Sequence, residues 1–140
     1  MKKLSVLALV LGVVLIVPQL RAEPPGARDA AEKSARAWLA LVDGKKYDAS
    51  WDQAASLFRK AVEKKQWSGT IESVRDPLGK VLSRKLVKAS YSESLPGAPD
   101  GKYVVIQFET KFEHKSSAVE TITPMMDTDG SWRVSGYFIK

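Results

Sequence analysis

Apolar residues recur with a helical period through the first half of the chain. In residues 28–43 they fall at intervals of three and four, which predicts an amphipathic helix that Gly44 ends. A second, shorter helix is expected to begin at Asp48, whose side chain can cap free backbone N–H groups, and to continue after a break. A third helix is predicted over residues 64–75, where Trp67, Ile71 and Val74 share one face. It is expected to end there because Pro77 disfavours helical geometry at the residue before it.

The pattern changes from helical spacing to alternation at residue 81. Strands are predicted over residues 81–92, 102–114, 117–126 and 131–140, and a loop rich in proline and glycine separates the first two. Helices followed by an antiparallel meander are the order of an α+β fold, with three helices packed on a four-stranded sheet. The chain is therefore expected to form one α+β domain.

Turn lengths decide which side chains share a face of this sheet. A two-residue turn at Lys115 and Ser116 would place Lys111 opposite Glu120, a favourable pair of charges. An even-length turn over residues 127–130 would then bring the large apolar side chains to one face. The inner face predicted in this way consists of Val104, Ile106, Phe108, Thr110, Phe112, Val119, Thr121, Thr123, Met125, Trp132, Val134 and Phe138. It holds no carboxylate, and for this reason catalysis on this face is not expected.

The opposite face of the predicted sheet keeps an apolar component. It carries Tyr103, Val105, Ile122, Tyr137 and Ile139 among charged residues. Apolar area of this extent is typical of a homodimer interface, but single hydrophobic residues also occur on ordinary protein surfaces. Both interpretations stay open, and a homodimer through the outer sheet face is one arrangement to expect.

The N-terminus has the layout of a secretory signal peptide. Lys2 and Lys3 precede an uncharged, mostly apolar run over residues 4–17, and Ala22 suits the position before a cleavage site. The run is shorter than the roughly 20 residues that span a bilayer, although an uncleaved anchor stays open. We expect export to the periplasm or the medium, with membrane contact through the signal peptide alone. The expected organisation is a signal peptide over residues 1–22, a flexible leader over 23–27 and a domain over 28–140.

Composition narrows the chemistry of this domain. The chain has no cysteine, which excludes a lipidated cysteine, a disulfide and a thiolate metal site. Basic residues exceed acidic ones by six over the whole chain and by three after residue 22. Because the two signs are interleaved, they are typical of a solvated helix face, and attraction to anionic envelope polymers or lipid head groups is the alternative. So small an excess in an exported protein argues against a nucleic-acid partner.

Familiar catalytic and metal-binding patterns are absent from the sequence. His114 is the single histidine, so the usual zinc ligand set is missing. Residues 127–130 resemble part of a calcium loop, but they lack the frame and final glutamate of an EF-hand and suit a hairpin turn. No serine-nucleophile signature and no glycine-rich phosphate loop occur. No cofactor and no metal are therefore expected.

A small set of polar and aromatic side chains remains as the candidate site. If a pocket lies between helices and sheet, Thr110, Thr121 and Thr123 are its hydrogen-bonding groups, since they are the polar members of the predicted inner face. Trp51 is less constrained than the other tryptophans and is expected to rim such a pocket. His114 is expected to be solvated beside a turn, with a role in the pocket as the alternative.

Several short motifs resemble a known family. They are Ala37-Trp38-Leu39, Asp43-Gly44, Tyr47, Ser50-Trp51, Arg75 with Pro77-Leu78-Gly79, and the ending Thr121–Met125 through Asp129–Tyr137. Over about residues 30–140 the chain resembles the uncharacterised bacterial family catalogued as domain of unknown function 4019. The resemblance implies an exported envelope protein similar in fold to the cystatin-like, nuclear-transport-factor-2-like group, a cone of helices on a curved antiparallel sheet. It implies no activity, cofactor or site residue, and it leaves function open.

The function expected from the sequence is that of a non-enzymatic module of the cell envelope that binds a small ligand or a protein. Two alternatives stay open. One is a dimeric interaction or structural protein of the envelope, and the other is an enzyme acting on a small hydrophobic substrate. A carboxylate inside a pocket would favour the enzyme, because a desolvated acid has a raised pKa suited to proton transfer.

Overall fold

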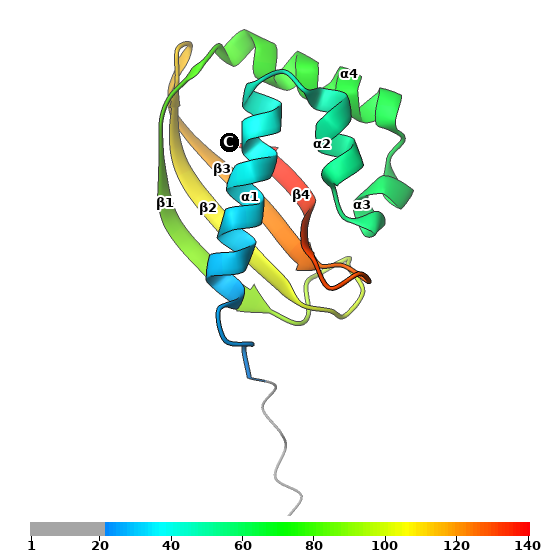
Figure 1. Ribbon diagram of the computed structural model, residues 1–140. Helices are drawn as coiled ribbons and strands as arrows, with labels where there is room; N and C mark the ends of the chain where they lie inside the picture. Colours follow the sequence, from blue (N-terminus) through cyan, green and yellow to red (C-terminus); the bar gives the residue numbers. More distant parts are fainter. Residues whose placement is uncertain (1–21) are drawn as a thin grey trace, which may run out of the picture.

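The computed structural model describes residues 22–140 (Figure 1), so the predicted signal peptide lies, apart from Ala22, outside the described residues. The elements in chain order are α1 (Ala27–Asp43), α2 (Tyr47–Gln53), α3 (Ser56–Ala61), α4 (Lys64–Arg75), the 3₁₀ turn η1 (Asp76–Leu78), β1 (Val81–Ser92), β2 (Tyr103–Phe112), β3 (Lys115–Met126) and β4 (Trp132–Ile139). The strands form one antiparallel sheet in the order β1-β2-β3-β4, and Figure 1 shows it curving around α1. The predicted α+β fold, with helices packed on a four-stranded antiparallel sheet, is confirmed.

The helical half contains four α-helices where three are predicted. Ala54 and Ala55 adopt extended backbone angles, with ψ of 163° and 150°, and they divide α2 from α3. Asp48 does not cap α2, contrary to the prediction: Lys46 holds that position without a side-chain bond, and the Asp48 carboxylate accepts a hydrogen bond from Ser68 instead. Within residues 22–140, none of the helices combines the length and the apolar character that crossing a membrane requires.

The core is a layer of aromatic and aliphatic side chains between the helices and the sheet. Its buried members are Ala31, Ala35, Trp38, Leu39, Val42, Trp67, Ile71, Val104, Ile106, Phe108, Ile122 and Val134. Trp38 and Trp67 lie with ring centroids 5.9 Å apart. Both indole N–H groups donate to the buried Ser50, that of Trp38 to its carbonyl (2.8 Å) and that of Trp67 to its hydroxyl (2.9 Å). The two tryptophans therefore fill the core, and both of their indole N–H groups are hydrogen-bonded.

The β2–β3 hairpin differs from the predicted register. Its turn is formed by residues 113–114, not by residues 115–116. That change alone would keep the predicted faces, because it moves the pairing by an even number of residues. A bulge just before the turn shifts the pairing by one residue more, so Glu120 lies opposite Phe108 instead of Lys111. The bulge thus turns every side chain of β3 to the other face of the sheet.

The prediction for β3 is therefore wrong in its faces. Glu120 and Ile122 are fully buried on the side of the helices, whereas Val119 is 38% exposed on the outer face. The outer face also holds Thr121, Thr123 and Met125, which were expected inside. Contrary to the prediction, the inner face does contain a carboxylate, and the reason given above against catalysis no longer holds.

The apolar residues of the outer face are not the ones predicted. Tyr137 lies on the inner side, where it packs edge-on against Trp38 with ring centroids 5.3 Å apart. Tyr103 stays on the outer face but is 1% exposed, and its hydroxyl donates to the carbonyl of Pro99 in the loop that follows β1 (2.6 Å). Phe138, expected inside, is 54% exposed on the outer face. The outer face has thus lost Ile122, Tyr137 and Ile139 and has gained Val119, Met125 and Phe138 in their place.

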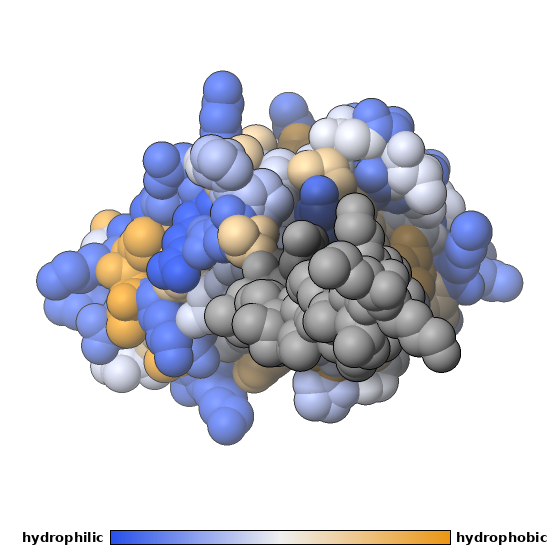
Figure 2. All heavy atoms as spheres, turned by 90° about the horizontal axis from the view of Figure 1, so that it is seen from below, coloured by the Kyte–Doolittle hydropathy of each residue, from blue (hydrophilic) through white to orange (hydrophobic). Residues whose placement is uncertain are grey.

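Further exposed apolar residues lie in the edge strand β1. Leu82 and Val87 are 67% and 59% exposed, and each is the extra residue of a bulge in the pairing of β1 with β2. Figure 2 shows hydrophobic residues gathered on the left, the side on which β1 lies in Figure 1. Bulges and lysines are devices that keep an edge strand from pairing with another chain. The edge of β1 therefore disfavours pairing with a further strand.

Candidate functional site

A charged cluster lies between the helices and the sheet, centred on Glu120, which has no exposed surface. Arg84 of β1 donates from Nε to Oε1 (2.7 Å) and from Nη2 to Oε2 (3.2 Å) of this carboxylate. Thr110 of β2 donates to Oε1 (2.5 Å), and the hydroxyl of Tyr137 in β4 donates to Oε2. Each of the four strands thus contributes one side chain, and both oxygens of the buried carboxylate are satisfied.

The helices complete the cluster through Asp43 at the end of α1. Arg84 donates from Nη1 to Oδ2 of Asp43 (2.7 Å), and Arg75 of α4 donates from Nη2 to Oδ1 (2.7 Å). Two carboxylates thus meet two guanidinium groups, and their formal charges cancel. Nε and Nη1 of Arg75 have no hydrogen-bond partner among the described residues, and the guanidinium lies over the Phe112 ring, 4.9 Å from its centroid.

These contacts fix the protonation of two members of the cluster, Asp43 and Tyr137. Burial disfavours ionisation of Asp43, but hydrogen bonds from Arg84 and Arg75 outweigh it and hold the pKa of the Asp43 carboxyl below its ordinary value. Burial and the adjacent charge of Glu120 raise the pKa of the Tyr137 hydroxyl far above its ordinary range. The hydroxyl therefore remains a donor at neutral pH. The cluster has the properties of a structural link, not of a group that exchanges protons.

An open groove of about 460 Å³ lies between α1, the end of α2 and the β3–β4 hairpin. It is lined by Ser34, Ala37, Trp38, Leu41, Gln53, Ser131, Trp132, Arg133 and Val134. Its volume falls within the roughly 300–1,000 Å³ typical of small-molecule sites. Aromatic and aliphatic side chains share the lining with hydroxyl, amide and guanidinium groups, which is the usual composition of such a site.

The walls of the groove are fixed to one another by backbone contacts. The hydroxyl of Ser34 in α1 donates to the carbonyl of Trp132 (2.7 Å). The amide of Ala55, between α2 and α3, donates to the carbonyl of Val134 (2.8 Å). Both bonds end on β4, so the helices and the strand hold their spacing without a ligand. A pre-formed site loses less affinity to ordering when a ligand binds.

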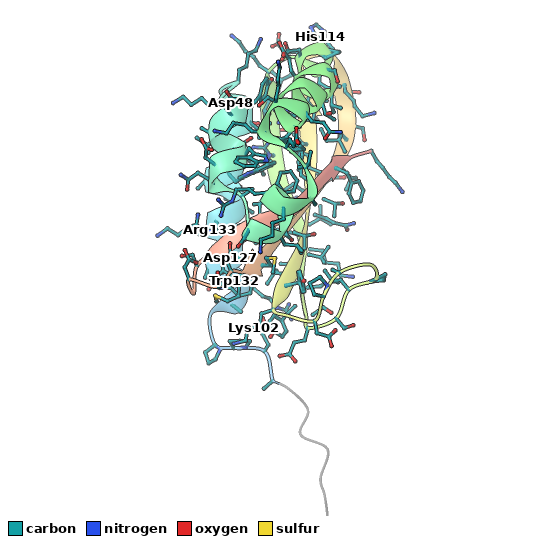
Figure 3. The ribbon with its side chains drawn as sticks, turned by 90° about the vertical axis from the view of Figure 1, so that its right-hand side faces the viewer. Asp48, Lys102, His114, Asp127, Trp132 and Arg133 are labelled. Carbon is teal, nitrogen blue, oxygen red and sulfur yellow. The ribbon has the colours of Figure 1, made fainter. Side chains whose placement is uncertain are left out.

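Asp127 anchors the hairpin that forms the end of the groove (Figure 3). Its carboxylate accepts hydrogen bonds from the amide (2.8 Å) and the hydroxyl of Ser56, at the start of α3. These bonds, the hydroxyl first, lower the pKa of Asp127 to about 2. Arg133 donates to Asp129 in the same turn (3.0 Å). Figure 3 shows Asp127, Trp132 and Arg133 gathered at this hairpin, which these bonds hold in place.

Trp132 lines the groove and has a polar group that forms no hydrogen bond within the described residues. It is half-buried, and its indole N–H makes no hydrogen bond with another residue in the range 22–140. The indole N–H groups of Trp38, Trp51 and Trp67 all donate to partners within the protein. An amphipathic side chain in this state offers both a flat apolar surface and a free donor.

A smaller pocket of about 220 Å³ opens between the ends of α1 and α4 and the β2–β3 turn. The hydroxyl of Tyr47 donates to Asp76 there (2.7 Å), and burial together with that carboxylate raises the pKa of Tyr47 to about 12. Its lining includes three acidic and three basic side chains, Asp43, Asp76, Glu113, Lys45, Arg75 and Lys80. The balance of charge gives this pocket no net attraction for an ion.

The structure does not bring the five predicted pocket residues together. Thr110 is buried in the charged cluster, whereas Thr121 and Thr123 lie on the outer face of the sheet. Trp51 is half-buried, and its indole N–H donates to a backbone carbonyl between α3 and α4 (2.8 Å). His114 is exposed in the β2–β3 turn, and Figure 3 shows it at the opposite end of the molecule from the groove. Among the described residues, no group of three or more acidic or histidine side chains is placed to hold a metal ion.

Sequence reasoning missed both the groove and the charged cluster. The cluster has no local signal, because its ion-paired residues lie 32 to 41 positions apart in the chain. The groove has one weak signal, a tryptophan directly after a glycine-containing turn, where the end of a strand meets solvent. Alternation placed that tryptophan on the inner face, where it packs against the core and also lines the groove.

Comparison with known proteins yields a family but no activity. The model of the family described as protein of unknown function, DUF4019, matches residues 34–137. No curated protein matches the chain. The matched range includes the whole lining of the groove and all six residues of the charged cluster.

Proposed function

We propose that this chain, which belongs to the family of proteins of unknown function DUF4019, is a non-enzymatic binding module of the cell envelope. Its site is the groove between α1 and the β3–β4 hairpin, and its ligand is a small molecule with a flat apolar part and a polar edge. The observation that carries the proposal is the fixed groove of about 460 Å³, which is lined by Trp132, a side chain whose indole N–H has no partner within residues 22–140. The apolar part fits against the indole, and Ser34, Gln53 and Arg133 orient the polar edge.

Proton-transfer chemistry has little support in this groove. The lining contains no carboxylate and no histidine. The buried Glu120 is taken up by Arg84, Thr110 and Tyr137, and it lines neither the groove nor the smaller pocket. A general base must come within hydrogen-bond reach of the proton that it removes. These features favour binding without turnover.

The envelope part of the proposal rests on the signal peptide predicted from sequence, which lies almost wholly outside the described residues. The two alternatives named earlier, a dimeric interaction protein and an enzyme for a small hydrophobic substrate, are outcomes of the same experiment.

Native mass spectrometry of the protein purified from its own cell envelope tests this proposal. We expect a monomer that has lost residues 1–22 and carries a small molecule, and we expect Trp132→Ala to lose that added mass. Phe138→Ser is the matched control, because it removes an exposed aromatic residue outside the groove and should keep the ligand. A ligand retained by Trp132→Ala would exclude the groove. A ligand-free dimer would support the interaction protein, and a molecule chemically converted during incubation would support the enzyme.

A dye supplies a second measurement if the natural ligand is lost during purification. The probe 1-anilinonaphthalene-8-sulfonate combines flat rings with a charged edge. We expect saturable binding to the wild type and to Phe138→Ser, and its loss in Trp132→Ala. Equal binding to all three would place the dye on the general surface and argue against the groove.

A further inference from the structure

The outer face of the sheet carries an excess of unpaired lysines. This face includes Lys85 and Lys88 of β1, Lys111 of β2 and Lys140 after β4. Lys111 alternates with buried residues of β2, and the other three pair with outer-face residues of the neighbouring strands. None of the four forms an ion pair with another residue of the range 22–140. Glu109, opposite Lys85, is the one acidic residue that the described strands place on this face. The face is therefore distinctly cationic although the chain as a whole is only mildly so.

A hollow of about 420 Å³ lies among these lysines beside the β2–β3 turn. Lys85 and Lys111 line it together with the hydroxyl side chains of Ser83, Ser116 and Ser117. Within the described residues, none of these three hydroxyls makes a hydrogen bond. Ammonium groups and free hydroxyls are donors that bind phosphate oxygens. The carboxylate of Glu109 also lines the hollow and opposes an anion, but the two lysines outnumber it.

Two exposed apolar side chains continue this face towards β4. Val119 pairs with Glu109 and is 38% exposed. Phe138 pairs with Thr121 and is 54% exposed, which makes it a diagonal neighbour of Val119 on the same face. The interface of a bilayer offers both anionic charge and apolar surface, whereas a soluble acidic chain offers charge alone. The combination therefore favours a lipid surface over an acidic polymer.

We propose that the outer sheet face binds the surface of an anionic phospholipid bilayer. Head-group phosphates occupy the hollow between Lys85 and Lys111, and Phe138 enters the interface beside it. The helices lie on the other side of the sheet (Figure 1). The proposed groove shares no lining residue with the hollow, so this role does not depend on that groove. A second copy stacked on this face would bring lysines against lysines, which disfavours a homodimer here.

Vesicle co-sedimentation tests the lysines. The full chain is expressed and the protein is used with the N-terminus that the cell leaves, so that all variants share it. Wild type should bind vesicles of phosphatidylethanolamine and phosphatidylglycerol, release in high salt, and bind phosphatidylcholine vesicles far less. Lys85→Gln with Lys111→Gln should weaken binding roughly 30-fold, because each lysine near an anionic surface contributes about a factor of five. Lys33→Gln with Lys60→Gln, two exposed lysines of α1 and α3, is the matched control and should change binding little.

Phe138→Ser separates a bilayer from a soluble polyanion. It should weaken vesicle binding several-fold and leave binding to heparin, a soluble sulfated polymer, unchanged. If both double variants lose vesicle binding equally, overall charge causes the attraction and the proposal is wrong. Undiminished binding of the Lys85→Gln, Lys111→Gln variant would also overturn it. Binding to heparin but not to the anionic vesicles would assign this face to an acidic polymer.

Discussion

Among single residues, Asp127 joins parts of the chain that are distant in sequence. It lies in the β3–β4 turn, yet both of its carboxylate oxygens accept hydrogen bonds from Ser56, 71 positions earlier. Its side chain is 7% exposed, and these hydrogen bonds replace the ones that the charged carboxylate would make to water. The position of α3 against the hairpin, and with it one end of the groove, depends on this ionised group.

Protonation of Asp127 should therefore lower the free energy of unfolding. Its pKa falls from an ordinary 3.8 to about 2 on folding. The resulting stabilisation, roughly 1–2 kcal/mol, is complete above about pH 4 and is lost as the pH falls through about 2. Urea unfolding over this interval should show a steeper loss in wild type than in Asp127→Asn, which lacks the group throughout.

Asp52→Asn is the control for this measurement. The Asp52 carboxylate makes an exposed pair with Lys64 (2.7 Å), and such pairs contribute little, so this variant should follow the wild type. The same pH dependence in wild type and Asp127→Asn would contradict the role given to Asp127.

Lys45 holds a backbone conformation that suits glycine. Its φ of 58° lies in the left-handed region directly after α1, where its amide bonds to the carbonyl of Val42 (3.0 Å) and closes the helix end. A side chain in this conformation costs about 1 kcal/mol, so Lys45→Gly should raise the free energy of unfolding by about that amount. Lys46→Gly is the matched control, since its φ of −88° needs no glycine, and it should lower stability. Urea midpoints in the reverse order would contradict the prediction.

At the scale of elements, the sequence predicts periods well and hairpin faces poorly. The bounds of β1 are as predicted because a local period ends in a loop of proline and glycine, and those of α4 because proline follows the helix. In β3, residues of intermediate polarity stand on both faces, so alternation does not decide which face is buried. The pairing of Lys111 with Glu120 was the deciding argument. The turn at residues 113–114 removes that pair, and a bulge that has no sequence signature then reverses the faces of β3.

The candidate site was hard to predict for the same reason. A local pattern assigns a strand glutamate to solvent, because a buried charge needs partners that the pattern does not contain. Glu120 is buried because Arg84 and Tyr137 reach it from two other strands. The groove likewise forms only where α1 packs against the β3–β4 hairpin, and no local sequence pattern predicts that contact. Of the predicted pocket residues, Thr110 alone meets this buried carboxylate.

The joint between the helical half and the sheet depends on Gly79. Its φ is 75°, and a Cβ at this position would lie 2.9 Å from the Cβ of Glu113. Gly79→Ala should therefore destabilise the fold by about 1–3 kcal/mol, because backbone strain adds to the clash. Gly69→Ala in α4 is the matched control: nothing lies within 4 Å of its new Cβ, and it should stabilise the fold by about 1 kcal/mol. Thermal unfolding should show a lower midpoint for Gly79→Ala and a higher one for Gly69→Ala than for wild type. An unchanged midpoint for Gly79→Ala would mean that the turn rearranges without cost.

Across the whole molecule, the charged cluster links the helical layer to the sheet by ion pairs. Asp43 stands at the end of α1 and Arg75 at the end of α4, and Arg84 links them to Glu120 in the sheet. Replacing a buried ion pair by apolar residues is often neutral, but removing one partner leaves an uncompensated charge. The cluster holds α1 in place, and α1 forms one wall of the groove. The shape of the groove therefore depends on residues outside its own lining.

Glu120→Gln should therefore act on the whole fold and not on one layer. The substitution keeps the shape of the side chain but leaves Arg84 with Asp43 alone, and we expect a loss of about 3 kcal/mol. Glu109→Gln is the matched control, an exposed glutamate on the neighbouring strand whose loss should change stability by less than about 0.5 kcal/mol. Tryptophan fluorescence reports mainly on the helices, because three of the four tryptophans lie in them, whereas far-UV circular dichroism reports on both layers. If the cluster couples the layers, the unfolding midpoints measured by both signals should fall together in Glu120→Gln. If the helices of the wild type already unfold before its sheet, other contacts determine the cooperativity of unfolding.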